Sequence, residues 1–225
     1  MLPKCVVEPI SLELYHNGII KFLSEPRKLA SGLKSRIYLD MEKVPGDKIF
    51  CKNFQEQLSE WLNSNPNISG RLIYPIPFGG KPWLNIVKSC FPNQSKELIL
   101  EKEQIERFSR GEAVELTVEQ RGVINGAAGQ EVEVIVIEDV FTTGGSIAKN
   151  TKFLKSVLLN PRKAVAVIDR QRPRDREFLD YGLEVFSFLT ITDVLAPLVN
   201  IPNILPREEN QIAKEELSLI QKGGV

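Results

Sequence analysis

Histidine is nearly absent from this chain, because His16 is the only one among 225 residues. Metal sites built from several histidines are therefore excluded, and nucleophilic catalysis by a serine, a histidine and an aspartate is not expected. Cysteine is also scarce, and its three residues are far apart and form no metal-ligand pattern, which predicts reduced thiols in a cytoplasmic protein. The three are Cys5, Cys51 and Cys90.

Net charge and long apolar runs are lacking as well. Lysine plus arginine and aspartate plus glutamate number 29 each, so no overall field draws the chain to nucleic acid or to an anionic membrane. No apolar run approaches the length of a membrane span, and Glu8 and Glu13 interrupt the N-terminal region where a signal sequence needs an apolar core. We expect a cytoplasmic protein with one α/β domain and appendages.

The most informative stretch of the chain is residues 134–146. It begins with four β-branched residues, 134–137, a short apolar run typical of a strand buried on both faces of a parallel sheet. Two carboxylates, Glu138 and Asp139, end this run, and a helical pattern begins at Ile147. The turn between them consists of small and hydroxyl-bearing residues: Thr142, Thr143, Gly144, Gly145 and Ser146.

Paired acids beside such a turn have a chemical meaning. In open α/β sheets ligands bind at the carboxyl ends of strands, and the start of the next helix offers free amide groups to a phosphate. The acids can accept hydrogen bonds from ribose hydroxyls while the turn wraps a phosphate on the same sugar. A Walker loop and a dinucleotide fingerprint do not fit, because the required lysine and the third spaced glycine are missing. The alternative is an ordinary strand–turn–helix unit with a solvated acidic end.

This stretch resembles the phosphoribosyl pyrophosphate (PRPP) signature of the type I phosphoribosyltransferases. The resemblance implies that Glu138 and Asp139 hold the ribose hydroxyls and that the turn holds the 5′-phosphate. Three further stretches resemble orotate phosphoribosyltransferases. Residues 29–40 resemble their base-covering segment, residues 164–170 resemble a strand ending in an arginine that meets orotate, and residues 181–195 resemble their closing strand and helix.

From this resemblance we expect an α/β fold with a doubly wound, mostly parallel sheet. It implies an N-terminal base-covering segment at residues 1–45, a phosphoribosyltransferase core at 46–199, and a linker and C-terminal helix at 200–225. The implied activity is transfer of phosphoribose from PRPP to orotate by a homodimer. Mg²⁺ would be bound chiefly through PRPP, without a protein metal cluster.

The resemblance also assigns roles to residues outside the signature. It implies pyrophosphate contacts from Phe78, Gly79 and Gly80, catalytic roles for Lys102, Arg107 and Asp139, and base contacts from Tyr38 and Arg170. Each role has a plainer alternative: the two loop cations would be solvated, Arg170 would belong to a charge run before a helix, and the two aromatic residues would be core residues.

Residue patterns predict helices alternating with strands along the chain, which favours a parallel sheet. We expect one long helix over 8–24, ended by Pro26, and an irregular, charged excursion over 101–130 with room for a small hairpin at 114–118. Helices are also expected at 50–62, 83–87, 147–157, 174–181, 192–199 and 211–221. Strands are expected at 36–39, 72–76, 97–100, 134–137, 164–168 and 183–189.

The chain departs from the family pattern where chemistry would need cations. Glu101 and Ile105 stand where the loop arginine and lysine are usual, and Ala30 stands where the base-covering segment has a lysine. Two alternatives therefore stay open beside orotate transfer. One is a phosphoribosyltransferase for another base, and the other is a PRPP-binding regulatory protein with weak or lost catalysis.

Overall fold

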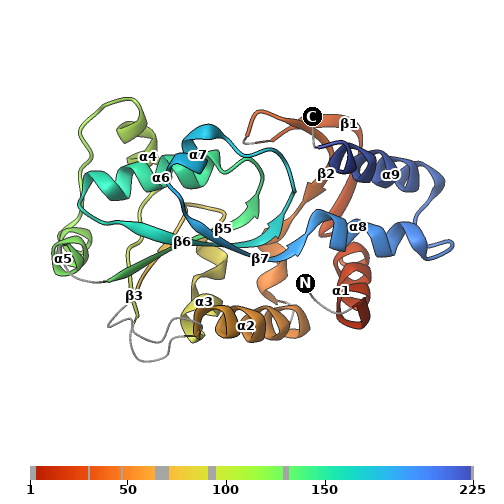
Figure 1. Cartoon of the computed structure of the whole chain (residues 1–225), viewed down its shortest axis with the longest axis horizontal. Coiled ribbons are helices and arrows are strands. Elements are labelled where there is room, and N and C mark those ends of the chain that lie inside the picture. Colours follow the sequence, from red (N-terminus) through yellow and green to blue (C-terminus); the bar gives the residue numbers. More distant parts are fainter. Residues whose placement is uncertain are drawn as a thin grey trace.

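The structure is a computed structural model that describes residues 4–29, 31–46, 48–63, 71–90, 95–128 and 132–223. Its centre is a parallel sheet with the strand order β4-β3-β5-β6-β7 (Figure 1). The chain starts this sheet in the interior and builds outward in both directions, so the order reverses between β3 and β5. Such a reversal is the usual place for a ligand in an open α/β sheet. The strands are β3 (Arg71–Pro75), β4 (Ser95–Glu97), β5 (Glu133–Phe141), β6 (Pro161–Asp169) and β7 (Glu184–Thr190).

Helices cover both faces of this sheet, and each face has its own apolar cluster. Alternate residues of the central strand β5 point to opposite clusters, Ile135 and Ile137 to one and Val134 and Val136 to the other. The first cluster is covered by α2 (Lys48–Asn63), α3 (Leu84–Ser89) and α8 (Ile191–Asn200). The second is covered by α4 (Lys102–Ser109), α5 (Val118–Ala127), α6 (Gly145–Ser156) and α7 (Arg176–Asp180). The predicted doubly wound parallel sheet is therefore confirmed.

The N-terminal and C-terminal segments pack together beside the sheet (Figure 1). Strands β1 (Ile20–Lys28) and β2 (Lys34–Leu39) form an antiparallel pair, which we call the hood. Helices α1 (Lys4–His16) and α9 (Arg207–Gln221) lie beside the hood and α8, and all of them contribute to the first apolar cluster. Two short 3₁₀ turns complete the described elements: η1 (Met41–Gly46) and η2 (Lys81–Trp83).

Two predicted elements are wrong. The helix expected over 8–24 ends at His16, because Gly18 adopts a left-handed φ of 64° and turns the chain into β1. Pro26 therefore lies in a strand of the hood, where β1 and β2 pair with a shift in register. The excursion at 101–130 holds α4 and α5 in place of a hairpin.

Other predicted elements agree with the structure within a few residues. The strand expected at 97–100 lies slightly earlier, at β4, and its apolar residues Leu98 and Leu100 are buried just after the strand ends. The final helix begins earlier than expected, at Arg207. No helix within the described ranges is long and apolar enough to cross a membrane.

Candidate functional site

The paired acids lie at the carboxyl end of β5, at the reversal in strand order. Glu138 is only 7% exposed, whereas Asp139 is half-buried and accepts a hydrogen bond from the Val140 amide at 2.7 Å. Burial and the neighbouring Asp139 charge raise the pKa of Glu138 well above its usual value, and hydrogen bonding from Ser146 opposes this only in part. The two acids therefore differ: Glu138 is buried and its pKa is raised, whereas Asp139 is the more accessible carboxylate.

The predicted phosphate turn follows β5 and leads directly into α6. Gly144 has a left-handed φ of 92°, and a Cβ there would lie 2.5 Å from the ring of Phe178. Only glycine fits this combination of backbone angle and close contact. The turn presents the first amide groups of α6, a helix of twelve residues, toward the strand-end crevice. Thr143 contributes differently, because its hydroxyl donates to Asp175 at 2.7 Å and braces the turn.

A second glycine loop, after β3, approaches the acids from the other side. A Cβ on Gly79 would lie 2.2 Å from Glu138 Oε1 and 2.6 Å from Asp139 Oδ1. A Cβ on Gly80 would lie 2.3 Å from the carbonyl oxygen of Ile137. The loop therefore needs both glycines to pass close to β5. Phe78 before them has a φ of 73° and is 65% exposed, so it is not a core residue.

Helix α4 supplies one cation beside this loop. The Lys102 Nζ lies 5.4 Å from the ring centroid of Phe78, within range of a cation–π contact, and 3.5 Å from a carboxylate oxygen of Glu106. Ile105 is buried in the second apolar cluster, and Glu101 caps α4 while its carboxylate accepts from Lys81 at 2.9 Å. Both residues that replace family cations thus have structural contacts.

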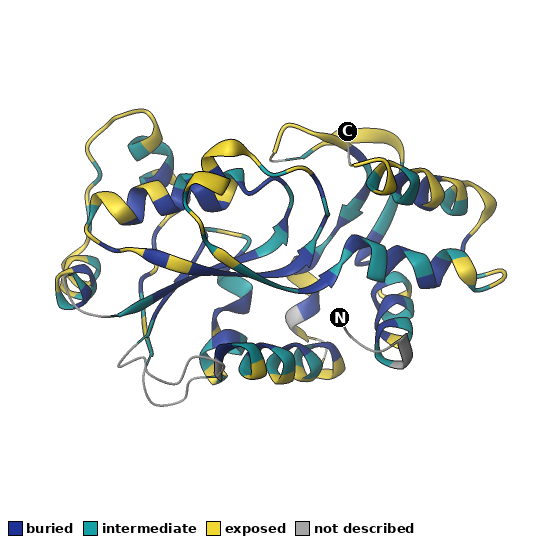
Figure 2. Cartoon of the chain, viewed as in Figure 1, coloured by how far each residue is buried: buried dark blue, intermediate teal, exposed yellow. Residues whose placement is uncertain are grey.

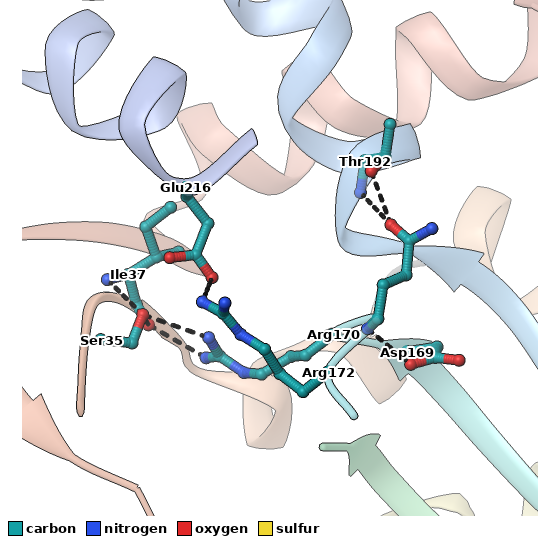
Figure 3. Close-up of polar contacts among 8 residues, drawn as sticks. Ser35, Ile37, Asp169, Arg170, Arg172, Thr192 and Glu216 are labelled. Atoms are coloured by element: carbon teal, nitrogen blue, oxygen red, sulfur yellow. Dashed lines mark hydrogen bonds and ion pairs between the residues drawn. The ribbon is translucent and has the colours of Figure 1, made fainter. Parts of the chain in front are cut away.

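The hood and the end of β6 form the other side of the site. Tyr38 of β2 is half-buried, with the Arg27 guanidinium 4.9 Å from its ring centroid. Arg170 is buried, and its guanidinium donates to the carbonyl oxygen of Ile37 at 3.0 Å and to the Ser35 hydroxyl at 3.4 Å (Figure 3). Burial lowers the pKa of Arg170 to about 10, so it stays protonated at neutral pH. Ala30 lies outside the described residues.

A cavity of about 810 Å³ joins these parts. Three of the predicted site residues, Thr143, Gly80 and Arg107, do not line it, and Arg107 instead contacts Glu112 at 3.5 Å. The following predicted residues line the cavity together: Tyr38, Phe78, Gly79, Lys102, Glu138, Asp139, Thr142, Gly144, Gly145, Ser146 and Arg170. Residues that are far apart in the sequence, such as Tyr38 and Arg170, thus meet at one site. Figure 2 shows that the strands of the central sheet are largely buried, whereas many of the connecting loops are exposed.

Three charged residues of this cavity were missed in the sequence. Lys149 lies in the first turns of α6, where helical spacing from the signature turn would have pointed to it. Asp175 and Glu106 had no such signal, because they reach the cavity only through the packing of α7 and α4. The ionisable lining is therefore mixed, with the carboxylates Glu106, Glu138, Asp139 and Asp175 and the cations Lys102, Lys149 and Arg170.

The fold is that of a type I phosphoribosyltransferase. Within that class, the chain is similar to orotate phosphoribosyltransferases. It is 23% identical to "Orotate phosphoribosyltransferase" of Sulfurisphaera tokodaii over 184 residues, which cover 82% of this chain and 86% of the relative. No family model matches the chain.

Solved structures agree with this relative. The orotate phosphoribosyltransferase from Aeropyrum pernix superposes with a TM-score of 0.58 at 21% identity, covering 84% of this chain and 98% of that one. The Mycobacterium tuberculosis H37Rv enzyme in complex with PRPP gives a TM-score of 0.55 at 17% identity with the same coverage of both chains. The predicted resemblance to orotate phosphoribosyltransferases is thereby confirmed.

Proposed function

We propose that this protein transfers phosphoribose from PRPP to orotate and releases orotidine monophosphate and pyrophosphate. The observation that carries the proposal is the pair Glu138 and Asp139, which lies beside a glycine-bearing turn at the reversal between β3 and β5. The names of the relatives support orotate as the acceptor. The PRPP complex of the Mycobacterium tuberculosis enzyme supports PRPP as the donor.

Each part of PRPP has a matching part of the cavity in this proposal. The 5′-phosphate binds the turn 142–146 and the first amides of α6. The ribose hydroxyls bind the acids at the end of β5. The pyrophosphate lies along Phe78 and Gly79 near Lys102, and the base lies at the end of the cavity that Tyr38 of the hood and Arg170 line together.

The proposed reaction depends on stabilising the charges that develop in the transition state. The pyrimidine nitrogen attacks C1 of the ribose while the bond to pyrophosphate breaks, so positive charge develops on the sugar. The Asp139 carboxylate lies beside that sugar and stabilises the developing charge, and Lys102 stabilises the departing pyrophosphate. Glu138, whose pKa is raised by burial, serves as a hydrogen-bonding partner of a ribose hydroxyl. Exclusion of water protects PRPP from hydrolysis.

We propose Mg²⁺ as the cofactor, bound chiefly through PRPP. Carboxylate oxygen is a ligand type that Mg²⁺ accepts, and Asp139 is the half-buried carboxylate in the right region. The cavity lining has no excess of cations over acidic side chains, so it does not by itself neutralise a substrate with several negative phosphates. Bound Mg²⁺ supplies the missing positive charge and orients the pyrophosphate.

We also propose a cytoplasmic homodimer. The resemblance to this family implies a dimer in which the loop of one subunit completes the site of its neighbour. A two-fold symmetric dimer is also the commonest assembly. Sedimentation at micromolar concentration tests this part, since a fully active monomer would contradict it.

A second candidate function is PRPP binding without transfer. The observation that favours it concerns the two positions where the family pattern has cations. One holds Ile105, which is buried, and the other holds Glu101, which pairs with Lys81, so neither position supplies a positive charge. Among the described residues of α4, Lys102 is the one cation that lines the cavity. PRPP then binds as a signal of nucleotide supply, and the cavity lacks part of the charge that catalysis requires.

One assay separates these functions. The protein is incubated with PRPP, Mg²⁺ and a panel of bases that includes orotate, and product nucleotides and PRPP are followed over time. Orotidine monophosphate as the main product supports the first proposal, and preference for another base supports the alternative acceptor. PRPP binding by calorimetry without turnover on any base supports the regulatory function. No binding and no turnover by folded protein would reject all three.

A further inference from the structure

The C-terminal helix α9 lies on the part of the molecule that covers the proposed base site. It runs beside the hood, α1 and α8 (Figure 1). Ile212 and Ala213 of α9 are buried in the same apolar cluster as Ile37 and Leu39 of β2. The hood, near the N-terminus, therefore packs against α9, which comes after the last strand of the sheet in the sequence.

A buried ion pair joins α9 to the segment that follows β6. Arg172 Nη2 lies 2.6 Å from Glu216 Oε1, and each side chain is only 7% exposed (Figure 3). A buried pair of this kind is costly to break, because removing one partner leaves the other charge buried and uncompensated. Its place in the chain is specific: Arg172 is two residues from Arg170, which lines the cavity.

Arg170 links the same spot to the hood. Its guanidinium donates to the Ile37 carbonyl and to the Ser35 hydroxyl of β2, so the positions of the arginine and of the hood strand depend on each other. The negative charge of Glu216 opposes the lowering of the Arg170 pKa by burial, whereas Arg172 adds to it. One carboxylate from α9 therefore lies next to two buried arginines, and pairs directly with one of them, Arg172 (Figure 3).

Other polar contacts of α9 with its surroundings are more exposed, and the partly buried one, from the Tyr15 hydroxyl to Glu209 at 2.7 Å, joins α9 to α1 and not to the hood. Arg36 of β2 lies 3.4 Å from Glu208 and 3.9 Å from Glu215, and the glutamates are largely exposed. Solvent-exposed pairs of this kind contribute little. The buried pair is therefore the polar contact of α9 with the largest expected effect on the base site.

We propose that α9 is a clamp for the acceptor-base site, and that Glu216 is its positioning residue. By pairing with Arg172, Glu216 docks α9 against the hood and fixes both Arg170 and β2 at the cavity. The link to the base rests on the proposed function. Loss of the clamp loosens the base end of the cavity and leaves the PRPP end, which belongs to β3, β5 and α6, unchanged.

The first test is amide hydrogen exchange of Glu216→Gln in the full chain. Glutamine keeps the shape of the side chain and one acceptor oxygen but removes the charge. We expect amides of β2 to exchange at least tenfold faster than in the parent protein, while β5 is unchanged. Glu215→Gln is the matched control on the same helix and is expected to behave as the parent. Equal protection of β2 in Glu216→Gln and Glu215→Gln would overturn the clamp.

The second test separates positioning from plain stability. In Glu216→Gln the KM for orotate is expected to rise about tenfold, while the KM for PRPP stays within about twofold. Equal changes in both constants would reject positioning. If the parent has no turnover with orotate, the proposed function fails, and hydrogen exchange still decides the clamp.

A rescue variant keeps the test decisive if the single variant folds poorly. Arg172→Met combined with Glu216→Met replaces the ion pair with apolar side chains of similar volume, which buried sites often tolerate. We expect this double variant to dock α9 and to restore slow exchange in β2. A folded double variant with β2 exchanging at least tenfold faster than in the parent would contradict the clamp.

Discussion

The loop after β5 and the segment after β4 reach the same cavity, but different interactions hold them in place. The turn 142–146 is fixed by backbone geometry, with Gly144 in a left-handed conformation against Phe178. Helices α4 and α5 are fixed by side chains, through buried Ile105 and through hydrogen bonds that join Gln104 to Gln120. The turn 142–146 is thus held by its backbone conformation, whereas the position of α4 and α5 depends on side-chain packing.

This difference has a consequence for the reaction. The acids and the phosphate turn need no rearrangement to meet a sugar phosphate, because strand and helix ends already hold them. Changes in the packing of α4 shift Lys102, the cation that we propose to face the pyrophosphate. We therefore expect variants of the turn to change PRPP binding and variants of α4 to change turnover.

The largest expected effect comes from removing the packing of α4. Ile105→Ala deletes a buried side chain from the second apolar cluster and is expected to lower the free energy of unfolding by about 3 kcal/mol. Denaturant unfolding measures this loss, with the exposed Ile49→Ala as control. A change below about 1 kcal/mol would mean that α4 is not packed as the structure has it.

The second prediction compares substitutions at two glycines, one in close contact with β5 and one in open space. Gly80→Ala forces a Cβ against the backbone of β5 and is expected to cost about 2 kcal/mol of stability. Gly122→Ala in α5 has open space around its Cβ and is expected to stabilise by about 0.5 kcal/mol. Thermal unfolding of both variants checks the pair. Equal effects would contradict the tight contact between the β3 loop and β5.

Lys102→Gln tests the cation of α4. We expect kcat with orotate to fall about tenfold, equivalent to about 1.4 kcal/mol of lost transition-state stabilisation, with little change in PRPP affinity. Steady-state kinetics and calorimetry measure the two quantities. Lys52→Gln, an exposed lysine of α2, is the matched control. An unchanged kcat in Lys102→Gln would remove this lysine from the catalytic residues.

The smallest expected effect concerns the pKa of Glu138. Because its pKa is raised in the folded protein, the folded state holds the proton more tightly than the unfolded state above pH 4.5, and the parent loses stability as pH rises. Glu138→Gln removes this loss and is expected to stabilise by about 1 kcal/mol at pH 8. At pH 4 the two proteins should have nearly equal stability.

Thermal unfolding of the two proteins at both pH values measures this difference. The exposed Glu60→Gln variant is the control for loss of a glutamate charge at the surface. A stabilisation by Glu138→Gln that is equal at pH 4 and pH 8 would mean that the folded pKa is not raised.

The signature could be predicted from sequence because its features are local. The apolar run of β5, the acids after it and the glycine turn follow one another directly, and each has a backbone reason. Helix α5 was missed although a capping box, Thr117 with Gln120, marks its start. The alternating residues at 114–118 favour a small hairpin, yet the chain is irregular there until α5 begins.

Other features depend on distant parts of the chain. Strand β1 follows α1 so closely that apolar residues of both fitted one helical pattern, and only the turn at Gly18 separates them. The burial of Ile105 and the contact of Arg170 with β2 arise from packing between separate elements. No local pattern predicts such contacts.

Calorimetry of PRPP binding in the presence of Mg²⁺ tests the central claim most directly. The parent protein and the control Asp180→Asn, an exposed aspartate of α7, should bind PRPP with the same affinity. Asp139→Asn keeps the acceptor oxygen for Val140 but loses the charge, and we expect a loss of about 1.5–3 kcal/mol in PRPP binding with thermal stability retained. Unchanged PRPP affinity in a folded Asp139→Asn variant would contradict the assignment of this cavity.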